Sequence, residues 1–137
     1  MCRPVPKERA ARKPSGKPLE ADILRDILKA LRAHPAVATV ERRQSGVFRD
    51  GNRFVRVGQR GLPDISGMLH GGRAYAIEVK RPGRLADERQ AEYLNRIQAA
   101  GGCAGVASSV SEAIAIVERV HAGTTQGENA LPARRRP

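Results

Sequence analysis

The sequence Gly-Leu-Pro-Asp at residues 61–64, followed by Ala-Ile-Glu-Val-Lys at residues 76–80, predicts two neighbouring strands and decides the fold. Successive side chains along a strand point to opposite faces, so Glu78 and Lys80 share one face and the apolar residues of the segment face a core. Asp64 precedes them at hairpin distance. The pattern therefore predicts that Asp64, Glu78 and Lys80 meet on one face of a sheet.

Two interpretations account for charged residues within this apolar segment. Charged side chains are rarely buried without partners, and a metal ion held by Asp64 and Glu78, with Lys80 beside it, would supply partners. Alternatively, Glu78 and Lys80 form a surface ion pair on a half-exposed strand. The preceding Pro63-Asp64 element favours the metal ion.

These residues resemble the PD-(D/E)xK pattern of metal-dependent nucleases. The wider string, formed by residues 61–67, residues 77–83 and Gln90 on a following helix, is similar to the VRR-NUC branch of that superfamily. This branch includes small stand-alone phage and prophage proteins and a domain of larger DNA-repair nucleases. The resemblance covers about residues 19–120. It implies a restriction-endonuclease-like fold and a metal-dependent endonuclease that hydrolyses phosphodiester bonds in DNA.

The resemblance also implies a role for each matching residue of the motif. Asp64, Glu78 and the backbone carbonyl of Val79 are expected to hold Mg²⁺ or Mn²⁺, which are hard cations that prefer oxygen ligands. Such an ion acidifies a bound water and neutralises the phosphate. Lys80 is expected to orient or help deprotonate the attacking water, or to stabilise the developing negative charge. No other small-molecule cofactor is expected.

Two further polar residues have a structural and a catalytic interpretation. Glu20 points inward from the first turn of a predicted helix, where an acid suits the helix dipole; nucleases of the resembling family often carry a glutamate there that reaches the metal site, through an outer-shell water or a second ion. Gln90 lies three residues after Asp87 and matches a capping box. The resemblance instead directs Gln90 towards the catalytic face, to position Lys80 or the scissile phosphate.

The charge of the chain predicts a polyanionic partner. The 137 residues carry a formal net charge of +11, which favours nucleic acid. Residues 1–18 carry six basic residues against one acidic, and their prolines predict a disordered basic arm. We expect a nuclease domain at residues 19–121 and a flexible basic tail at residues 122–137.

A hairpin with a turn at Asp50-Gly51 is predicted between residues 47 and 57. Alternate arginines on its two strands would line one face, where guanidinium groups pair with phosphate oxygens. The alternative is the solvated face of an amphipathic hairpin. The expected nucleic-acid contacts are Arg42, Arg43, Arg49, Arg53, Arg56, Arg60, Arg81 and Arg84.

The expected substrate is recognised by shape rather than by sequence. Aromatic residues make up 3% of the chain, without tryptophan, so base-stacking platforms are not expected. Contacts to phosphate position a protein without reading bases, which favours branched, flap or junction DNA. A homodimer would place two active sites on two strands. A catalytically silent nucleic-acid-binding module, a phage interaction protein with a basic surface, and an RNA substrate stay open as alternatives.

The two cysteines, Cys2 and Cys103, predict neither a disulfide nor a zinc site. No apolar run approaches the ~18 residues of a membrane span, and the basic amino terminus lacks the apolar region of a secretory signal. We therefore expect no membrane partner and a cytoplasmic location, in the bacterial host if the chain is phage-encoded.

Hydrophobic periodicity predicts an α/β fold in the order α-β-β-β-β-α-β-α, with a mixed central sheet flanked by helices. The last helix is expected to begin after Ser108-Ser109 or Ser111 and to bury Val110, Ile114, Val117 and Val120. The other elements are helices at residues 19–33 and 87–100, and strands at residues 37–43, 64–69, 73–80 and 103–107, besides the hairpin.

Overall fold

A four-stranded mixed sheet forms the centre of the computed structural model, which describes residues 19–43, 46–57 and 60–119. Its strands lie in the order β1 (Glu41–Arg42), β4 (Ile65–Met68), β5 (Ala74–Val79) and β6 (Cys103–Ala107). Strands β1, β4 and β5 are antiparallel neighbours, whereas β5 and β6 are parallel. The mixed sheet is thus confirmed. Both predicted tails and the domain boundary at residue 121 lie outside the described residues.

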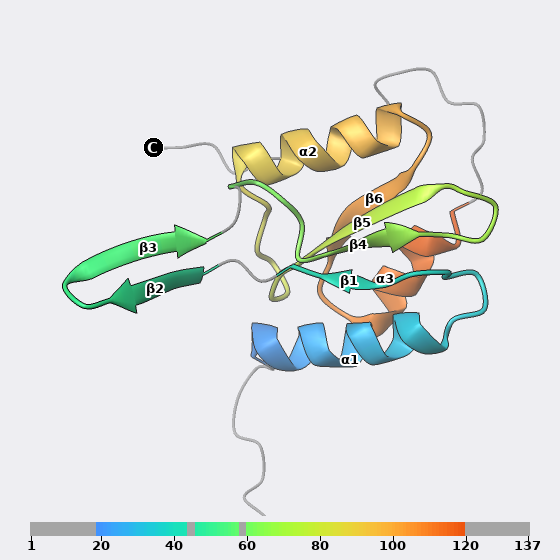
Figure 1. Cartoon of the computed structure of the whole chain (residues 1–137). Coiled ribbons are helices and arrows are strands. Elements are labelled where there is room, and N and C mark those ends of the chain that lie inside the picture. Colours follow the sequence, from blue (N-terminus) through green and yellow to red (C-terminus); the bar gives the residue numbers. More distant parts are fainter. Residues whose placement is uncertain (1–18, 44–45, 58–59, 120–137) are drawn as a thin grey trace, which may run out of the picture.

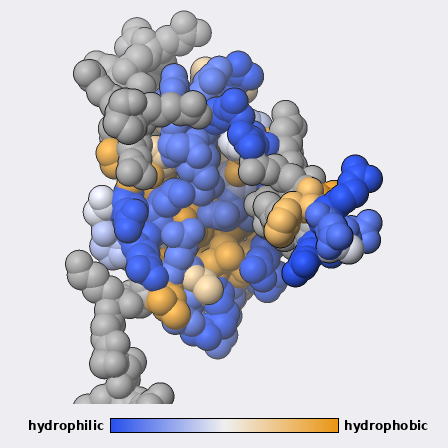
Figure 2. All heavy atoms as spheres, turned by 90° about the vertical axis from the view of Figure 1, so that its left-hand side faces the viewer, coloured by the Kyte–Doolittle hydropathy of each residue, from blue (hydrophilic) through white to orange (hydrophobic). Residues whose placement is uncertain are grey.

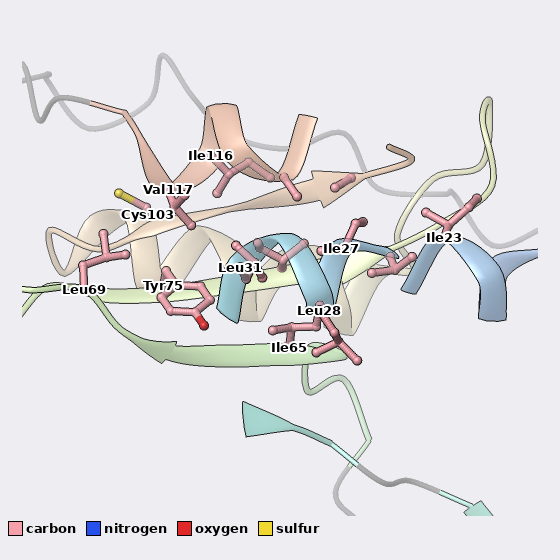
Figure 3. Packing of buried hydrophobic residues seen from close by; sticks show 14 residues of the cluster. Ile23, Ile27, Leu28, Leu31, Ile65, Leu69, Tyr75, Cys103, Ile116 and Val117 are labelled. Atoms are coloured by element: carbon pink, nitrogen blue, oxygen red, sulfur yellow. The ribbon is translucent and has the colours of Figure 1, made fainter. Parts of the chain in front are cut away.

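Helices cover both faces of this sheet, as predicted (Figure 1). Helices α1 (Glu20–Ala33) and α3 (Val110–Val117) pack on one face, and α2 (Glu88–Ala99) packs on the other. Figure 3 shows the apolar side chains of α1 and α3 gathered against those of the sheet. Spacings of three and four residues bring apolar side chains to one face of a helix, which explains the burial of Ile23, Ile27, Leu28 and Leu31 in α1.

Strand β5 is buried on both faces, because it lies between helices on each side. Ile77 and Val79 belong to the core under α1 and α3, whereas Ala76 packs with Leu94 of α2. Glu78 alternates with Ile77 and Val79 and therefore faces the α2 side. Its side chain is almost fully buried, with 2% of its surface exposed. The surface ion pair on a half-exposed strand is thus contradicted.

In the described residues five strands precede α2, as many as the predicted residue ranges gave, although the predicted order counted four; the strand expected at residues 37–43 is interrupted. The N–H groups of Ala38 and Thr39 both donate to the Met68 carbonyl, so two residues oppose one, as in a β-bulge. Gly67 allows this close approach: a side chain there would overlap the Thr39 carbonyl oxygen and lie 2.9 Å from Tyr75 Cε1. Only Glu41–Arg42 remains as regular strand.

Helix α3 differs from the prediction in the face that it buries. Of the three serines, Ser109 is the N-cap, and its side chain accepts from Glu112 N at 3.2 Å. The buried side chains are Ala113, Ile116 and Val117, whereas Val110 is 37% exposed. Ile116 packs directly on the glycine of β6, and this contact sets the rotation of the helix. The predicted Val120 lies outside the described residues, and Ile114 is partly buried.

Strands β2 (Gly46–Asp50) and β3 (Arg53–Val57) form a separate two-stranded sheet that projects from the layered body (Figure 1). In its register Arg49 pairs with Phe54, and Asp50 pairs with Arg53. Because neighbouring residues point to opposite faces, Arg49 and Arg53 lie on opposite faces. The prediction that alternate arginines share one face is therefore wrong for this pair.

Within the described residues, no helix has both the length and the apolar character that crossing a membrane requires.

Candidate active site

Asp64, Glu78 and Lys80 meet where β5 ends. Asp64 comes directly before β4, Glu78 lies in the last part of β5, and Lys80 follows that strand. The first turns of α1 and α2 lie at the same end of the molecule (Figure 1). Figure 2 looks onto this end and shows a mostly hydrophilic surface with small hydrophobic patches. The sequence-predicted cluster is therefore present in the fold.

Two hydrogen bonds across the strand ends connect Asp64 with the end of β5, one to Glu78 and one to Val79. The Val79 N–H donates to Asp64 Oδ2 at 2.9 Å, and the Asp64 N–H donates to Glu78 Oε2 at 3.3 Å. The Val79 N–H thus takes a side-chain oxygen of Asp64 as its acceptor in place of a main-chain carbonyl of the β4–β5 ladder. This arrangement fixes both carboxylates towards each other.

The surroundings of Glu78 disfavour the ionised form of its carboxyl group. Gln90 Nε2 donates to Glu78 Oε1 at 2.7 Å, and Lys80 Nζ lies 3.4 Å from the same oxygen. Burial, and secondly the negative charge of Asp64, raise the pKa of Glu78 to about 8, although Lys80 acts in the opposite direction. One lysine thus does not fully compensate the carboxylate pair. A further cation would lower this pKa, because opposite charge favours the ionised form.

Gln90 caps helix α2 and contacts Glu78 at the same time. Its Oε1 accepts from Asp87 N at 2.9 Å, and its backbone N–H donates to Asp87 Oδ1 at 2.9 Å, which completes the capping box of α2. The amide nitrogen is therefore left to donate to Glu78. The predicted cap is confirmed, and the side chain contacts Glu78 in addition; its predicted role of positioning Lys80 or the scissile phosphate stays a prediction. The capping box fixes which end of the amide faces Glu78.

Lys80 also lines an open pocket of about 560 Å³ beside the carboxylates. The loop after β5 and the first residue of α1 form its other walls, which are Glu20, Arg81, Gly83, Arg84 and Leu85. Glu20 is an acidic residue of the first turn of α1, and it is exposed, so the prediction that it points inward is wrong. The structure therefore places Glu20 at the pocket next to Lys80, separated in sequence from the rest of the site. Gly83 and Leu85 were not predicted, although their position directly after the motif could have indicated them.

The donors of the site fit a hard divalent cation only with help from the backbone. Among the residues that the structure describes, no three His, Cys, Asp or Glu side chains form a metal-ligand group by themselves. Asp64 and Glu78 supply carboxylate oxygens. The Val79 carbonyl points to the same side of β5 as its N–H, which faces Asp64. Two carboxylates and one carbonyl are oxygen ligands of the kind that Mg²⁺ prefers, with water completing its shell.

The arginines predicted to bind nucleic acid are not gathered at one place. Arg81 and Arg84 line the pocket, and the Arg43 N–H donates to the Asp64 carbonyl at 2.9 Å. The remaining described arginines of the set, Arg42, Arg49, Arg53 and Arg60, are exposed. The side chain of Arg56 lies outside what the structure describes. The pocket is thus flanked by cations, and the hairpin carries a second group of them.

The protein is thus an α/β protein with a mixed sheet. Two facing carboxylates, a lysine and a glutamine lie at the end of strand β5. Comparison with known proteins adds no name to it, since no family model and no curated protein matches the chain.

Proposed function

We propose that this chain is a metal-dependent endodeoxyribonuclease of the VRR-NUC branch of the PD-(D/E)xK superfamily, with a restriction-endonuclease-like fold. The observation that supports it best is the meeting of Asp64, Glu78 and Lys80, with Gln90 holding Glu78. A buried glutamate facing an aspartate destabilises the fold where their charges are not fully compensated, and Lys80 alone compensates them only in part. Metal binding therefore explains the buried carboxylate pair better than a contribution to the stability of the fold does.

The residues divide the work of phosphodiester hydrolysis between them. Asp64, Glu78 and the Val79 carbonyl would hold Mg²⁺ or Mn²⁺, which when bound acidifies water and neutralises the phosphate. Lys80 Nζ, 3.4 Å from Glu78, is positioned to orient the attacking water and to stabilise negative charge that develops on the phosphate. Gln90 keeps the Glu78 carboxyl in place. Glu20 lines the same pocket and would contact the metal ion through a water molecule.

The test is incubation of the full chain with labelled fork, flap, four-way junction, linear duplex, single-stranded DNA and RNA of matched length. Cleavage is expected with Mg²⁺ or Mn²⁺ and not with EDTA. Strand breaks in branched DNA support the proposal. Binding without strand breaks under any metal would indicate the silent nucleic-acid-binding module. Neither binding nor breaks would indicate an interaction protein with a basic surface.

We further propose that two copies act on a junction, because one pocket can cut one strand only. Analytical ultracentrifugation is expected to show a homodimer with junction DNA present, with a mass of twice the 14.8 kDa chain plus the DNA. The same measurement with a linear duplex of equal length is the control. A single copy per junction at saturating protein would exclude paired cleavage and leave the nuclease proposal in place.

Changes at Gln90 separate its two roles. Gln90→Glu keeps an oxygen for Asp87 N but sets a carboxylate against Glu78, whereas Gln90→Ala removes both contacts. We expect Gln90→Glu to melt within a few degrees of the parent and to need less metal for half-maximal cleavage, because a third carboxylate beside Glu78 attracts the cation. Gln90→Ala is expected to lose about 1 kcal/mol of stability as well.

The matched control is Asp87→Ala, which removes the cap and does not contact Glu78. It is expected to lower the melting temperature without changing the metal requirement. If Gln90→Glu and Asp87→Ala change the metal requirement equally, then Gln90 acts through the helix alone and the contact with Glu78 has no role in cleavage.

A further inference from the structure

The projecting hairpin of β2 and β3 carries an aromatic ring that the fold does not use. Phe54 is 76% exposed, the most exposed of the large hydrophobic side chains that the structure describes, and its neighbour Val55 is 41% exposed. The hairpin forms its own two-stranded sheet, and within the described residues its strands do not pair with the central sheet. An isolated hairpin is marginally stable in water. An exposed ring on such an element contributes nothing to the core and is available to a partner.

A cation lies beside the ring on the same face of the hairpin. Arg49 is the cross-strand partner of Phe54, and directly opposed residues of an antiparallel pair bring their side chains together. Arg49 Nε donates to the Gly51 carbonyl at 3.1 Å, which holds the guanidinium near the turn. Arg53 adds an exposed cation on the other face. A ring with a guanidinium next to it matches a nucleobase with its phosphate.

The positive charge of the hairpin segment indicates which kind of partner binds this surface. Residues 42–60 contain six arginines and one aspartate, so the segment carries a net charge of +5. A second copy of the chain would bring the same positive charge against it, which is unfavourable at close range. A polyanion would be attracted. Among polyanions, nucleic acid offers flat rings for Phe54 together with evenly spaced phosphates for the arginines.

The root of the hairpin connects this surface to the candidate active site. The chain leaves β1 through Arg43, whose N–H donates to the Asp64 carbonyl at 2.9 Å, and it returns at Arg60, four residues before Asp64. A strand of five residues extends about 17 Å, roughly twice the ~8.5 Å depth of the major groove of DNA. The hairpin can therefore reach past the backbone of a duplex whose phosphate lies at the pocket.

We propose that this hairpin is a nucleic-acid-binding arm in which Phe54, near the turn, stacks on an unpaired base about one strand length from the phosphate at the active site. This inference rests on the proposed nuclease function for the position of that phosphate. It adds a substrate preference, because a ring can stack only where a base is open. The chain therefore selects forks, flaps or junctions with splayed bases over an intact duplex. The low aromatic content of the sequence did not predict such a contact.

The test measures binding by the full chain without cleavage, in EDTA, by fluorescence anisotropy on a fork and on a duplex of equal length. Phe54→Ala is expected to weaken fork binding by about 5- to 100-fold and duplex binding by less than about twofold, with the same dependence on salt concentration. Phe54→Tyr keeps a ring and is expected to retain the preference. Val55→Ala, a truncation on the opposite face, is the matched control and is expected to bind as the parent does.

A fluorescent base analogue, 2-aminopurine, at the branch point gives a direct reading of stacking. Its emission is expected to be quenched by the parent and by Phe54→Tyr, and to stay bright with Phe54→Ala. Equal fork binding by the parent and Phe54→Ala overturns the inference. So does a Phe54-dependent dimer without quenching, or Phe54-dependent binding to phosphatidylglycerol vesicles without a fork preference.

The outcomes for the arm and for the nuclease are separable. A Phe54-dependent fork preference in a chain that cuts nothing would retain the arm and reject the enzyme. Normal metal-dependent cleavage with no effect of Phe54→Ala on fork binding would reject the arm and retain the enzyme.

Discussion

Asp64→Asn is expected to lower metal-dependent DNA cleavage by about 10³-fold or more, because it removes one of two carboxylates that would hold the ion. The substitution preserves shape: an amide oxygen can still accept from Val79 N, which now donates to Asp64 Oδ2 at 2.9 Å. The fold should therefore survive. Initial cleavage rates over a range of Mg²⁺ and Mn²⁺ concentrations, with circular dichroism on the same samples, make the measurement.

The matched control is Asp26→Asn, which makes the same change of charge at an exposed position of α1, where the carboxylate pairs with Arg25. It is expected to cleave at the parental rate. Binding of uncut DNA in EDTA should be equal or tighter for Asp64→Asn, since a negative charge is lost near the phosphate. Cleavage by Asp64→Asn within about tenfold of the parent would place the metal elsewhere and remove the basis of the proposed mechanism.

Local sequence signals predicted the elements around this site well. Strand Cys103–Ala107 was predicted with the bounds that the structure has, and its parallel pairing with β5 follows from the helix between them. The N-cap of α2 was predicted as well, because the Asp87–Gln90 pair is a local pattern. In each case the signal lies within a few residues of the feature, so no distant contact was needed.

The structure differs from the prediction mainly where contacts between residues far apart in the sequence determine the local structure. The strand at residues 37–43 is interrupted because its bulge depends on Gly67 and on Tyr75, whose hydroxyl donates to the Thr39 carbonyl at 2.7 Å. The buried face of α3 depends on the fit of Ile116 to β6. Neither contact can be derived from the periodicity of one segment. The separation of Arg49 and Arg53, in contrast, is local and follows from hairpin register, with the turn at Gly51-Asn52, one residue after the predicted Asp50-Gly51.

The burial of Glu78 could have been derived from the sequence. The segment Ala-Tyr-Ala-Ile-Glu-Val at residues 74–79 is apolar on both alternating faces except for the glutamate, and this is typical of a strand covered by helices on both sides. The position of Glu20 at the pocket required the structure, because it depends on how α1 lies across the sheet. The residues of the candidate site were thus visible in the sequence, whereas their surroundings were not.

Glu78→Gln is expected to stabilise the metal-free protein at alkaline pH and to abolish cleavage. Burial, with Asp64, raises the pKa of Glu78 from 4.5 to about 8. The folded state therefore binds this proton more tightly than the unfolded state does. The resulting stabilisation is complete below about pH 4.5, and it is lost as the pH rises through about 8. At pH 9 the ionised glutamate costs the parent a few kcal/mol, which a neutral glutamine does not.

Urea denaturation in EDTA at pH 5, 7 and 9 measures this effect. The parent should lose unfolding free energy across the series relative to Glu78→Gln, with the curves closest at pH 5. Added Mg²⁺ should restore the parent at pH 9, because an ion that binds only the folded state stabilises it. Glu78→Gln should gain little from Mg²⁺, since the remaining carboxylate of Asp64 is a weaker site.

Glu92→Gln provides the control, because Glu92 is exposed on α2 and pairs with Arg96 at 2.7 Å. Its stability should follow the parental dependence on pH and metal, and its cleavage should be unchanged. Parallel stability curves for the parent and Glu78→Gln in EDTA would mean that Glu78 is already ionised without metal. The carboxylate pair would then be satisfied by Lys80 and Gln90 alone, and the electrostatic demand for a divalent ion would disappear. A site built for catalysis should instead show opposite changes in stability and activity on neutralising this one carboxylate.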